Sequence, residues 1–249
     1  MARSWYVEQL GSQSSFIDLA LDREDATMGA LSVTRDSWKQ ILASAVAILD
    51  DLERRDFPPP DIVMGGGTVL MFRFEHRLSR DIDFFLHDVQ WVTLLTPRLN
   101  DLAAAMVTNY VEQPNSIKLM LRHGDIDFVV AGAVTDATAV EKLDFMGRTF
   151  LLEATEEILA KKLFHRAVFF QGRDVFDMAA AIEFDRLSAV NAVRAAGSKA
   201  EILERRLEEL RLMPREKLER DILALEPGKH LVTDMIERTQ HFIQKETAK

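Results

Sequence analysis

Hydrophobic residues are spaced differently in two parts of this chain. Up to about Glu153 both helical and strand-like spacings occur, and after it the spacing is helical throughout. In the first part, apolar residues recur at helical spacing over 36–56, whereas shorter apolar or alternating segments are typical of strands. Three consecutive glycines, Gly65 to Gly67, separate the first such strand from a helix. The elements predicted for this part are helices at 36–56, 68–74 and 91–107, strands at 62–64, 81–86, 109–112, 116–122 and 125–130, and a strand pair within 142–152.

Beyond residue 155 every periodic segment is helical, and no glycine- or serine-rich linker precedes this part. The chain is therefore predicted to be an α+β protein. A sheet-containing lobe with N-terminal helices, residues 1–153, is expected to pack against a helical C-terminal lobe, residues 154–249. The predicted helices of that lobe are 155–170, 174–187, 189–196, 198–212, 215–224 and 229–246.

Composition narrows the class of protein. The 249 residues are 47% hydrophobic and 29% charged, as in ordinary globular proteins. Cysteine is absent, which excludes disulfides, thiolate metal sites and cysteine nucleophiles. No segment is apolar for long enough to span a membrane, and the N-terminal residues lack the apolar core of a secretory signal. We therefore expect a cytoplasmic protein without a membrane partner.

The net charge of −9 is unevenly distributed. Residues 1–187 hold 19 Lys and Arg against 29 Asp and Glu, whereas residues 188–249 hold 12 against 11. This acidic excess argues against a general nucleic-acid coat protein, but it is compatible with a divalent-cation site in the first part. Arginines over 205–220 alternate with glutamates, which is typical of a solvated helix face; a docking surface for RNA is the alternative.

Asp81 and Asp83 are the residues that most strongly indicate chemistry. Two carboxylates two positions apart on a strand point to the same face. Because Ile82 and Phe84 are expected to bury the strand, the repelling charges must be solvated, protonated or bound to a metal ion. The three glycines upstream form a strand-to-helix turn whose backbone N–H groups suit a phosphate. Either feature alone is more often an ordinary turn or strand end, but together they indicate nucleoside triphosphate chemistry.

These motifs resemble those of the polymerase-beta-like nucleotidyltransferase superfamily, in which glycines precede a strand carrying Asp-x-Asp. Here thirteen residues separate Gly67 from Asp81. The resemblance is more specifically to AbiEii/AbiGii-type toxin nucleotidyltransferases, and it covers roughly residues 60–185. It implies a polymerase-beta-like core, a mixed sheet flanked by helices. The motifs that carry it are Gly66-Gly67-Thr68, Arg77-x-Ser79-x-Asp81-Ile82-Asp83-Phe84-Phe85, residues 157–163, and Arg173-Asp174-x-x-Asp177.

The resemblance also implies a third carboxylate on a later strand. Asp127 fits best because apolar residues flank it on both sides, and Asp125, on the same face, is the alternative. Without the resemblance, this segment reads equally well as a plain edge strand. The resemblance implies that Lys162 contacts the nucleotide phosphates, with Lys161 as the alternative residue. A purely structural role is also open, in which Lys162 lies at the interface between the two lobes.

Asp174 and Asp177 are implied to lie beside the active site, Asp174 as a catalytic residue and Asp177 as a nucleotide-binding one. The sequence alone explains them differently, as the N-cap and the N3 residue of the next helix. Both interpretations stay open at this point.

The implied reaction transfers a nucleoside monophosphate from an NTP to an acceptor hydroxyl and releases pyrophosphate. Two Mg²⁺ ions, or Mn²⁺, would be held by Asp81, Asp83 and Asp127, and Asp127 would help to deprotonate the acceptor. The phosphates would be held by Gly66, Gly67, Thr68, Ser79 and Lys162.

The resemblance further implies a toxin of a toxin–antitoxin or phage-defence pair, with a separately encoded antitoxin as its partner. Its expected acceptor is the 3′ end of tRNA, whose modification blocks translation. Three alternatives remain. The first is a nucleotidyltransferase that acts on a protein or a small molecule. The second is a nucleotide-binding or protein-interaction module without turnover, and the third is a structural protein in which the motif is coincidental.

Overall fold

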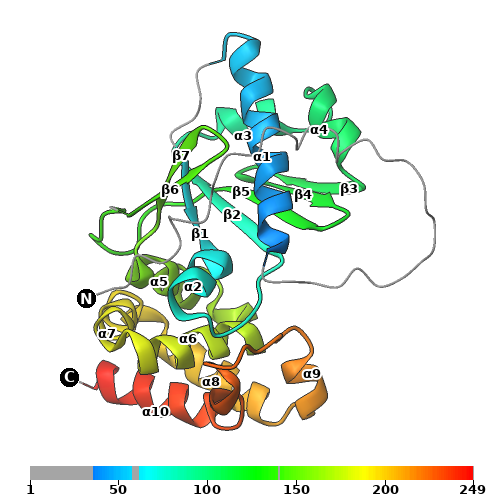
Figure 1. Ribbon diagram of the computed structural model, residues 1–249. Helices are drawn as coiled ribbons and strands as arrows, with labels where there is room; N and C mark the ends of the chain where they lie inside the picture. The colour runs from blue at the N-terminus through cyan, green and yellow to red at the C-terminus, as the bar shows by residue number, and fades with distance from the viewer. Residues whose placement is uncertain (1–35, 58–61, 140, 249) are drawn as a thin grey trace. The chain divides into compact units, whose positions relative to one another are not determined.

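The computed structural model describes residues 36–57, 62–139 and 141–248, all within one compact unit, Val33–Lys249. The strands in this part form one seven-stranded mixed sheet in the order β3-β4-β5-β2-β1-β7-β6 (Figure 1). The strands β1 and β2 pair antiparallel at its centre, and β2–β5 and β1–β7 pair parallel. The bounds are β1 Ile62–Gly65, β2 Asp81–Leu86, β3 Asn109–Gln113, β4 Ser116–Leu121, β5 Gly124–Val130, β6 Glu141–Phe145 and β7 Arg148–Leu152.

One face of the sheet carries the apolar core. On β2 and β5 every second side chain is fully buried, and the rings of Phe84 and Phe128 stack with their centroids 5.2 Å apart. Helix α1 (Ser37–Arg54) contacts both strands and contributes buried residues such as Ile41 and Leu42 (Figure 1). Because strand side chains alternate, the other face of β2 and β5 is left for polar residues.

The chain changes from strands to helices between Leu152 and Thr155, as predicted. The helices there are α5 Thr155–His165, α6 Gly172–Phe184, α7 Arg186–Ala195, α8 Ala200–Arg211, α9 Arg215–Glu219 and α10 Met235–Thr247, with 3-10 turns η2 Ala167–Phe169, η3 Gly197–Lys199 and η4 Lys229–Val232. Helix α6 lies at their centre, because it contacts α7, α9 and α10 as well as α2 (Gly66–Phe74) of the sheet-containing part. The predicted α+β class, a mixed sheet with a helical C-terminal half, is confirmed. The division into domains at residue 153 stays a prediction.

Four predicted helices are wrong in extent, one because of a nearby proline and another because the chain pairs with a distant segment. The helix predicted at 91–107 is two helices, α3 Gln90–Leu95 and α4 Asp101–Met106. Proline disfavours a helical conformation in the residue before it, and Thr96, before Pro97, is extended. The side chain of Asn100 then caps α4 by accepting from the Ala103 N–H at 2.8 Å.

The helix predicted at 215–224 ends at Glu219 because the chain beyond it pairs with another segment. Ala224 forms an isolated antiparallel bridge with Arg77, supported by hydrogen bonds from Leu78 N to Leu223 O and from Leu225 N to His76 O. The helix predicted at 229–246 likewise divides into η4 and α10, and the one at 155–170 into α5 and η2. The bridge ties the helical half directly to the loop before β2.

The capping interpretation of Asp174 and Asp177 is wrong in register. Helix α6 begins two residues earlier than predicted, with Gln171 as its N-cap and Asp174 as the N3 residue of a capping box. Asp177 lies beyond the first turn. Residues 1–35 of the predicted sheet-containing lobe lie outside the described residues. In the described part, no helix has both the length and the apolar character needed to cross a membrane.

Candidate active site

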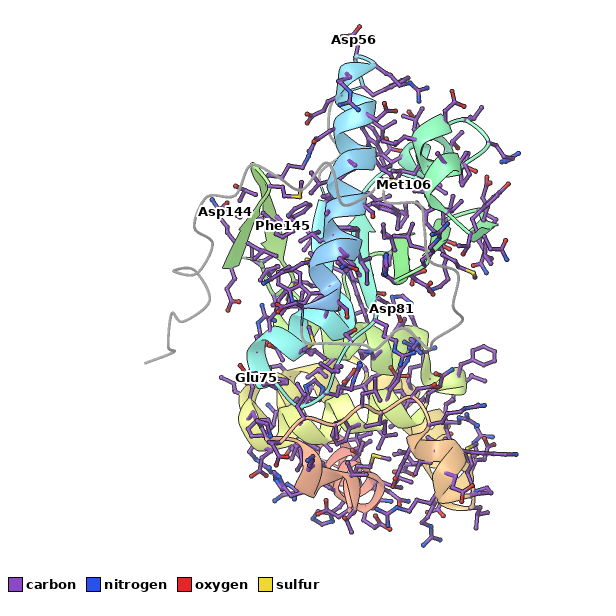
Figure 2. All side chains as sticks on the ribbon, turned by 45° about the vertical axis from the view of Figure 1, so that its right-hand side comes forward. Asp56, Glu75, Asp81, Met106, Asp144 and Phe145 are labelled. Carbon is purple, nitrogen blue, oxygen red and sulfur yellow. The ribbon has the colours of Figure 1, made fainter. Side chains whose placement is uncertain are left out.

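Four carboxylates share one face of the sheet because β2 and β5 pair in parallel register. Asp81 is opposite Asp125, and Asp83 is opposite Asp127. The residues between them on both strands are buried in the apolar core, so all four carboxylates lie on the other face. Figure 2 shows Asp81 where β2 approaches the helices of the C-terminal half. The residues predicted from Asp-x-Asp spacing and the predicted third carboxylate therefore lie together.

The glycine turn fits directly against Asp83. Gly66 has a φ of +67°, and a Cβ atom there would lie 1.8 Å from Asp83 Oδ2. Helix α2 begins at Gly66, two residues earlier than predicted, and a helix start carries partial positive charge. Gly67 is approached by Arg77, whose Nη2 would lie 2.6 Å from a Cβ at this position. Both glycines are therefore required by close contacts.

A Gly66→Ala substitution is expected to abolish the site's activity, because the new Cβ overlaps Asp83 and the backbone conformation is unfavourable for alanine. The left-handed conformation alone costs about 1–2 kcal/mol. Gly132→Ala is the matched control, since Gly132 lines the same cleft and a Cβ there meets nothing within 4 Å. Initial rates and melting temperatures of both variants test this. Equal activity of the two alanine variants would contradict the packing of Gly66 on Asp83.

Thr68 and Ser79 support the start of β2. The Oγ1 atom of Thr68 donates to Asp81 O at 2.5 Å, and Ser79 Oγ donates to the same carbonyl at 3.5 Å. Thr68 is fully buried and does not line the cleft, whereas Ser79 does. The contact that the structure gives Thr68 thus positions Asp81.

Lys118 lies among the carboxylates. Its Nζ atom is 2.5 Å from Asp127 Oδ2 and 3.2 Å from Asp125 Oδ2. Burial and then the charge of Asp83 raise the pKa of Asp127 to about 6, against the opposing effect of Lys118. Burial and the charge of Asp81 likewise raise the pKa of Asp83. The negative charge on this face is therefore only partly compensated by the protein.

Asp177 is at the centre of a buried ion-pair network. It accepts two hydrogen bonds from Arg77, from Nε at 2.6 Å and Nη2 at 2.8 Å, and its Oδ1 atom is 2.7 Å from His76 Nε2. Lys162 Nζ lies 3.2 Å from its other oxygen and 2.9 Å from Asp174 Oδ1. Both aspartates are buried, outside the cleft lining, and these partners hold their pKa below the usual range despite burial.

The two lysines of α5 have different partners. Lys162 pairs with Asp174 and Asp177, and its charge opposes the rise in the pKa of Asp83. Lys161 Nζ pairs with Glu153 at 2.5 Å and lies 3.7 Å from the centroid of the Phe85 ring. Both lysines line the cleft, so both remain candidates for contacting the nucleotide phosphates.

A cleft of about 840 Å³ runs over this face of the sheet and the adjoining helices. Of the residues singled out from sequence, the lining contains Gly66, Gly67, Ser79, Asp81, Asp83, Asp127 and Lys162, and it excludes Thr68, Asp174 and Asp177. Arginines that remain partly or fully exposed, among them Arg166, Arg173 and Arg220, also line the cleft, and we call them its rim. Arg173 Nη1 lies 3.4 Å from Asp81 Oδ2. The arrangement offers a cavity of ligand size with a carboxylate floor and a cationic rim.

The carboxylate oxygens fit a hard divalent cation by their chemistry, since Mg²⁺ prefers such donors. The raised pKa values of Asp83 and Asp127 fit as well, because a bound cation stabilises ionised carboxylates. As the side chains stand, no three acidic or histidine residues within the described chain converge on a single metal position. One oxygen of Asp127, Oδ2, is paired with Lys118.

Three residues of the cleft had no role in the sequence interpretation. Lys118 lies opposite Asp127 in the antiparallel pair β4–β5, so counting outward from the turn between these strands would have found it. Arg77 and Arg173 stand inside the quoted motifs, but their contacts connect segments about a hundred residues apart. No periodic pattern in the sequence reveals such contacts.

The comparisons with known proteins give a family match and a distant structural similarity. The family described as "Nucleotidyl transferase AbiEii toxin, Type IV TA system" matches residues 47–241, well over half of the chain. A solved structure of a STING-associated CdnE c-di-GMP synthase from Capnocytophaga granulosa is 13% identical, with 85% of this chain and 82% of that chain covered. Its TM-score of 0.29 is too low to support an argument. No curated protein matches significantly.

Proposed function

Because the chain belongs to the AbiEii nucleotidyl transferase toxin family, we propose that it transfers a nucleoside monophosphate from an NTP to the 3′ hydroxyl of tRNA. The family supplies the general activity, a nucleotidyltransferase within a toxin–antitoxin system. The observation that supports the specific reaction is the in-register pair of Asp83 and Asp127 beside the glycine turn, at the floor of an arginine-rimmed cleft.

In the proposed reaction, the acceptor oxygen forms a bond to the α-phosphorus as the bond to the β-phosphate oxygen breaks, and pyrophosphate leaves. Asp127 is our candidate to accept the hydroxyl proton, because it lies opposite Asp83 and lines the cleft. Gly66, Gly67 and Ser79 border the triphosphate, and Lys162 offsets its charge.

Asp81, Asp83 and Asp127 would hold Mg²⁺, which neutralises charge on the phosphates when bound. In this proposal Thr68, Asp174 and Asp177 act by positioning. Thr68 orients Asp81, and the two buried aspartates hold Lys162 and Arg77 at the cleft. An antitoxin is the expected protein partner, as the family implies.

A polyanionic acceptor is favoured over a small molecule by the cationic rim. Arg166, Arg173 and Arg220 line the cleft of a chain whose net charge is −9. Positive side chains gathered at the opening of an acidic site attract an RNA end locally, where the protein as a whole would repel it.

The test is to incubate the purified chain with Mg²⁺, total tRNA and each α-labelled NTP in turn. We expect label to enter tRNA from at least one nucleotide, with no label after EDTA treatment or in an Asp81→Ala variant. Periodate-oxidised tRNA is the acceptor control, because it lacks the terminal hydroxyls and should remain unlabelled. Label in protein, or in oxidised tRNA to the same extent, would overturn the 3′-end assignment.

A further inference from the structure

The connection between α5 and α6 exposes an aromatic ring that the fold does not need on its surface. In this short segment Ala167 and Phe170 are buried, whereas Val168 is 59% exposed and Phe169 is 72% exposed. Leaving a phenylalanine in water forgoes about 1.5–3 kcal/mol of burial free energy. The two buried neighbours anchor the segment, so the exposed pair does not result from a loose loop.

Hydrogen bonds hold the backbone that carries the ring. The Phe169 N–H donates to Arg166 O at 2.8 Å, and Arg206 Nε on α8 donates to Phe170 O at 2.9 Å. An ordered backbone at this position lowers the conformational entropy lost when a ligand binds the exposed ring.

The segment with Phe169 is flanked by residues of the candidate active site. Arg166 and Gln171 both line the cleft, and Phe169 lies two residues from Gln171, within about 7.6 Å between Cα atoms. Arg173 lines the cleft on the next turn, and the side chains of both arginines remain one-third exposed. Gly172 packs tightly on Leu218 O, which keeps the chain near Arg220 beside the same opening.

We propose that Phe169 is a stacking platform for an unpaired nucleobase of the acceptor RNA, with Arg166 and Arg173 contacting the adjacent phosphates. This inference rests on the proposed function and names the part of the surface that receives the RNA end. An exposed ring between arginines is suited to a single strand, because every base has a π-face and every linkage a negative charge. Phe169, Leu187 and Leu212 all lie outside the cleft lining, but of the three only Phe169 is within three residues of lining residues, Arg166 and Gln171.

The test compares Phe169→Ala with Phe169→Tyr, and Leu187→Ala serves as the matched control for loss of exposed apolar surface. We expect Phe169→Ala to raise the KM for tRNA about tenfold, because removing one stacked contact weakens binding on this order. The KM for the NTP and the melting temperature should stay unchanged, and Phe169→Tyr should restore tRNA affinity. An unchanged KM for tRNA in Phe169→Ala would overturn the platform.

A second measurement separates this inference from the proposed reaction. In a Phe169→Trp variant, titration with a short single-stranded RNA should quench the new fluorescence in a saturable, salt-sensitive way, relative to the three native tryptophans of the unmodified chain. Quenching without nucleotide transfer would support the platform and reject the reaction. Transfer without quenching would reject the platform alone. A fluorescence response to the antitoxin but not to RNA would reassign the surface to protein binding and overturn the inference.

Discussion

An Asp83→Asn variant is expected to lose nucleotide transfer by at least about a thousandfold, since under the proposed function Asp83 helps to hold Mg²⁺, and its loss removes several kcal/mol of transition-state stabilisation. The same variant should melt at an unchanged or higher temperature. Burial and the charge of Asp81 raise the pKa of Asp83, so the folded state binds this proton more tightly than the unfolded state. The ionised carboxylate therefore opposes folding at neutral pH, and the neutral amide removes that cost.

The measurement is the initial rate with labelled NTP beside thermal unfolding at several pH values. The difference in melting temperature between the variant and the unmodified chain should narrow as pH falls, because protonation makes Asp83 resemble asparagine. Asp101→Asn is the control, an exposed acid in the first turn of α4 that should change neither property. If the variant keeps most of its activity, Asp83 does not have the proposed role. If the variant melts at a lower temperature, the ionised Asp83 carboxylate does not oppose folding.

An Asp177→Asn variant is expected to have the opposite profile, a large loss of stability. Its carboxylate is fully buried and interacts with Arg77, His76 and Lys162. Neutralising it leaves buried cations without their counter-charge, which typically costs about 3–5 kcal/mol. Arg77 and Lys162 hold the pKa of the Asp177 carboxyl well below its usual range. The stability that this carboxylate contributes is therefore fully present above the pKa of an aspartate in the unfolded chain, and it is lost as the pH falls from there through the folded-state pKa.

Urea unfolding measures this effect, with Glu183→Gln as the control on the same helix. Glu183 is 41% exposed and pairs with Arg238, so its loss should cost at most about 1 kcal/mol. A double variant, Arg77→Met with Asp177→Leu, should recover stability relative to Asp177→Asn, because apolar side chains then replace both charges. If Asp177→Asn is fully stable but has a raised KM for the NTP, then Asp177 contacts the nucleotide, as the resemblance first implied.

The strands of the sheet and the shared face of the carboxylates could be predicted from the sequence, because both depend on residues that are close together in the chain. Alternation within 81–86 and 125–130 determines which side chains share a face, and the structure adds that the two strands pair in register. The helix ends were less accessible. Pro97 divides one predicted helix, and the pairing of Ala224 with Arg77 shortens another, although only the first of these causes is visible in the local sequence.

The surroundings of the carboxylates could not be predicted for a similar reason. The pairs that define them join residues far apart in the chain, such as Arg77 with Asp177 and Arg173 with Asp81. A motif can mark such residues, but which ones are buried depends on the packing of α6. This packing is why the buried Asp177 differs from the cleft-lining Asp83, although both are aspartates within recognised motifs.

The strand order has a consequence for how the toxin is made. The antiparallel pair β1–β2, joined through α2, carries the glycine turn and the Asp81/Asp83 pair, yet it is synthesised before the strands that flank it on both sides, β5 and β7. During translation the outer edge of β2 stays unpaired until β5 has been made, and that of β1 stays unpaired until β7 has been made. A fragment that ends between these two strands therefore exposes the edge of β1, and unpaired strand edges promote association with other chains.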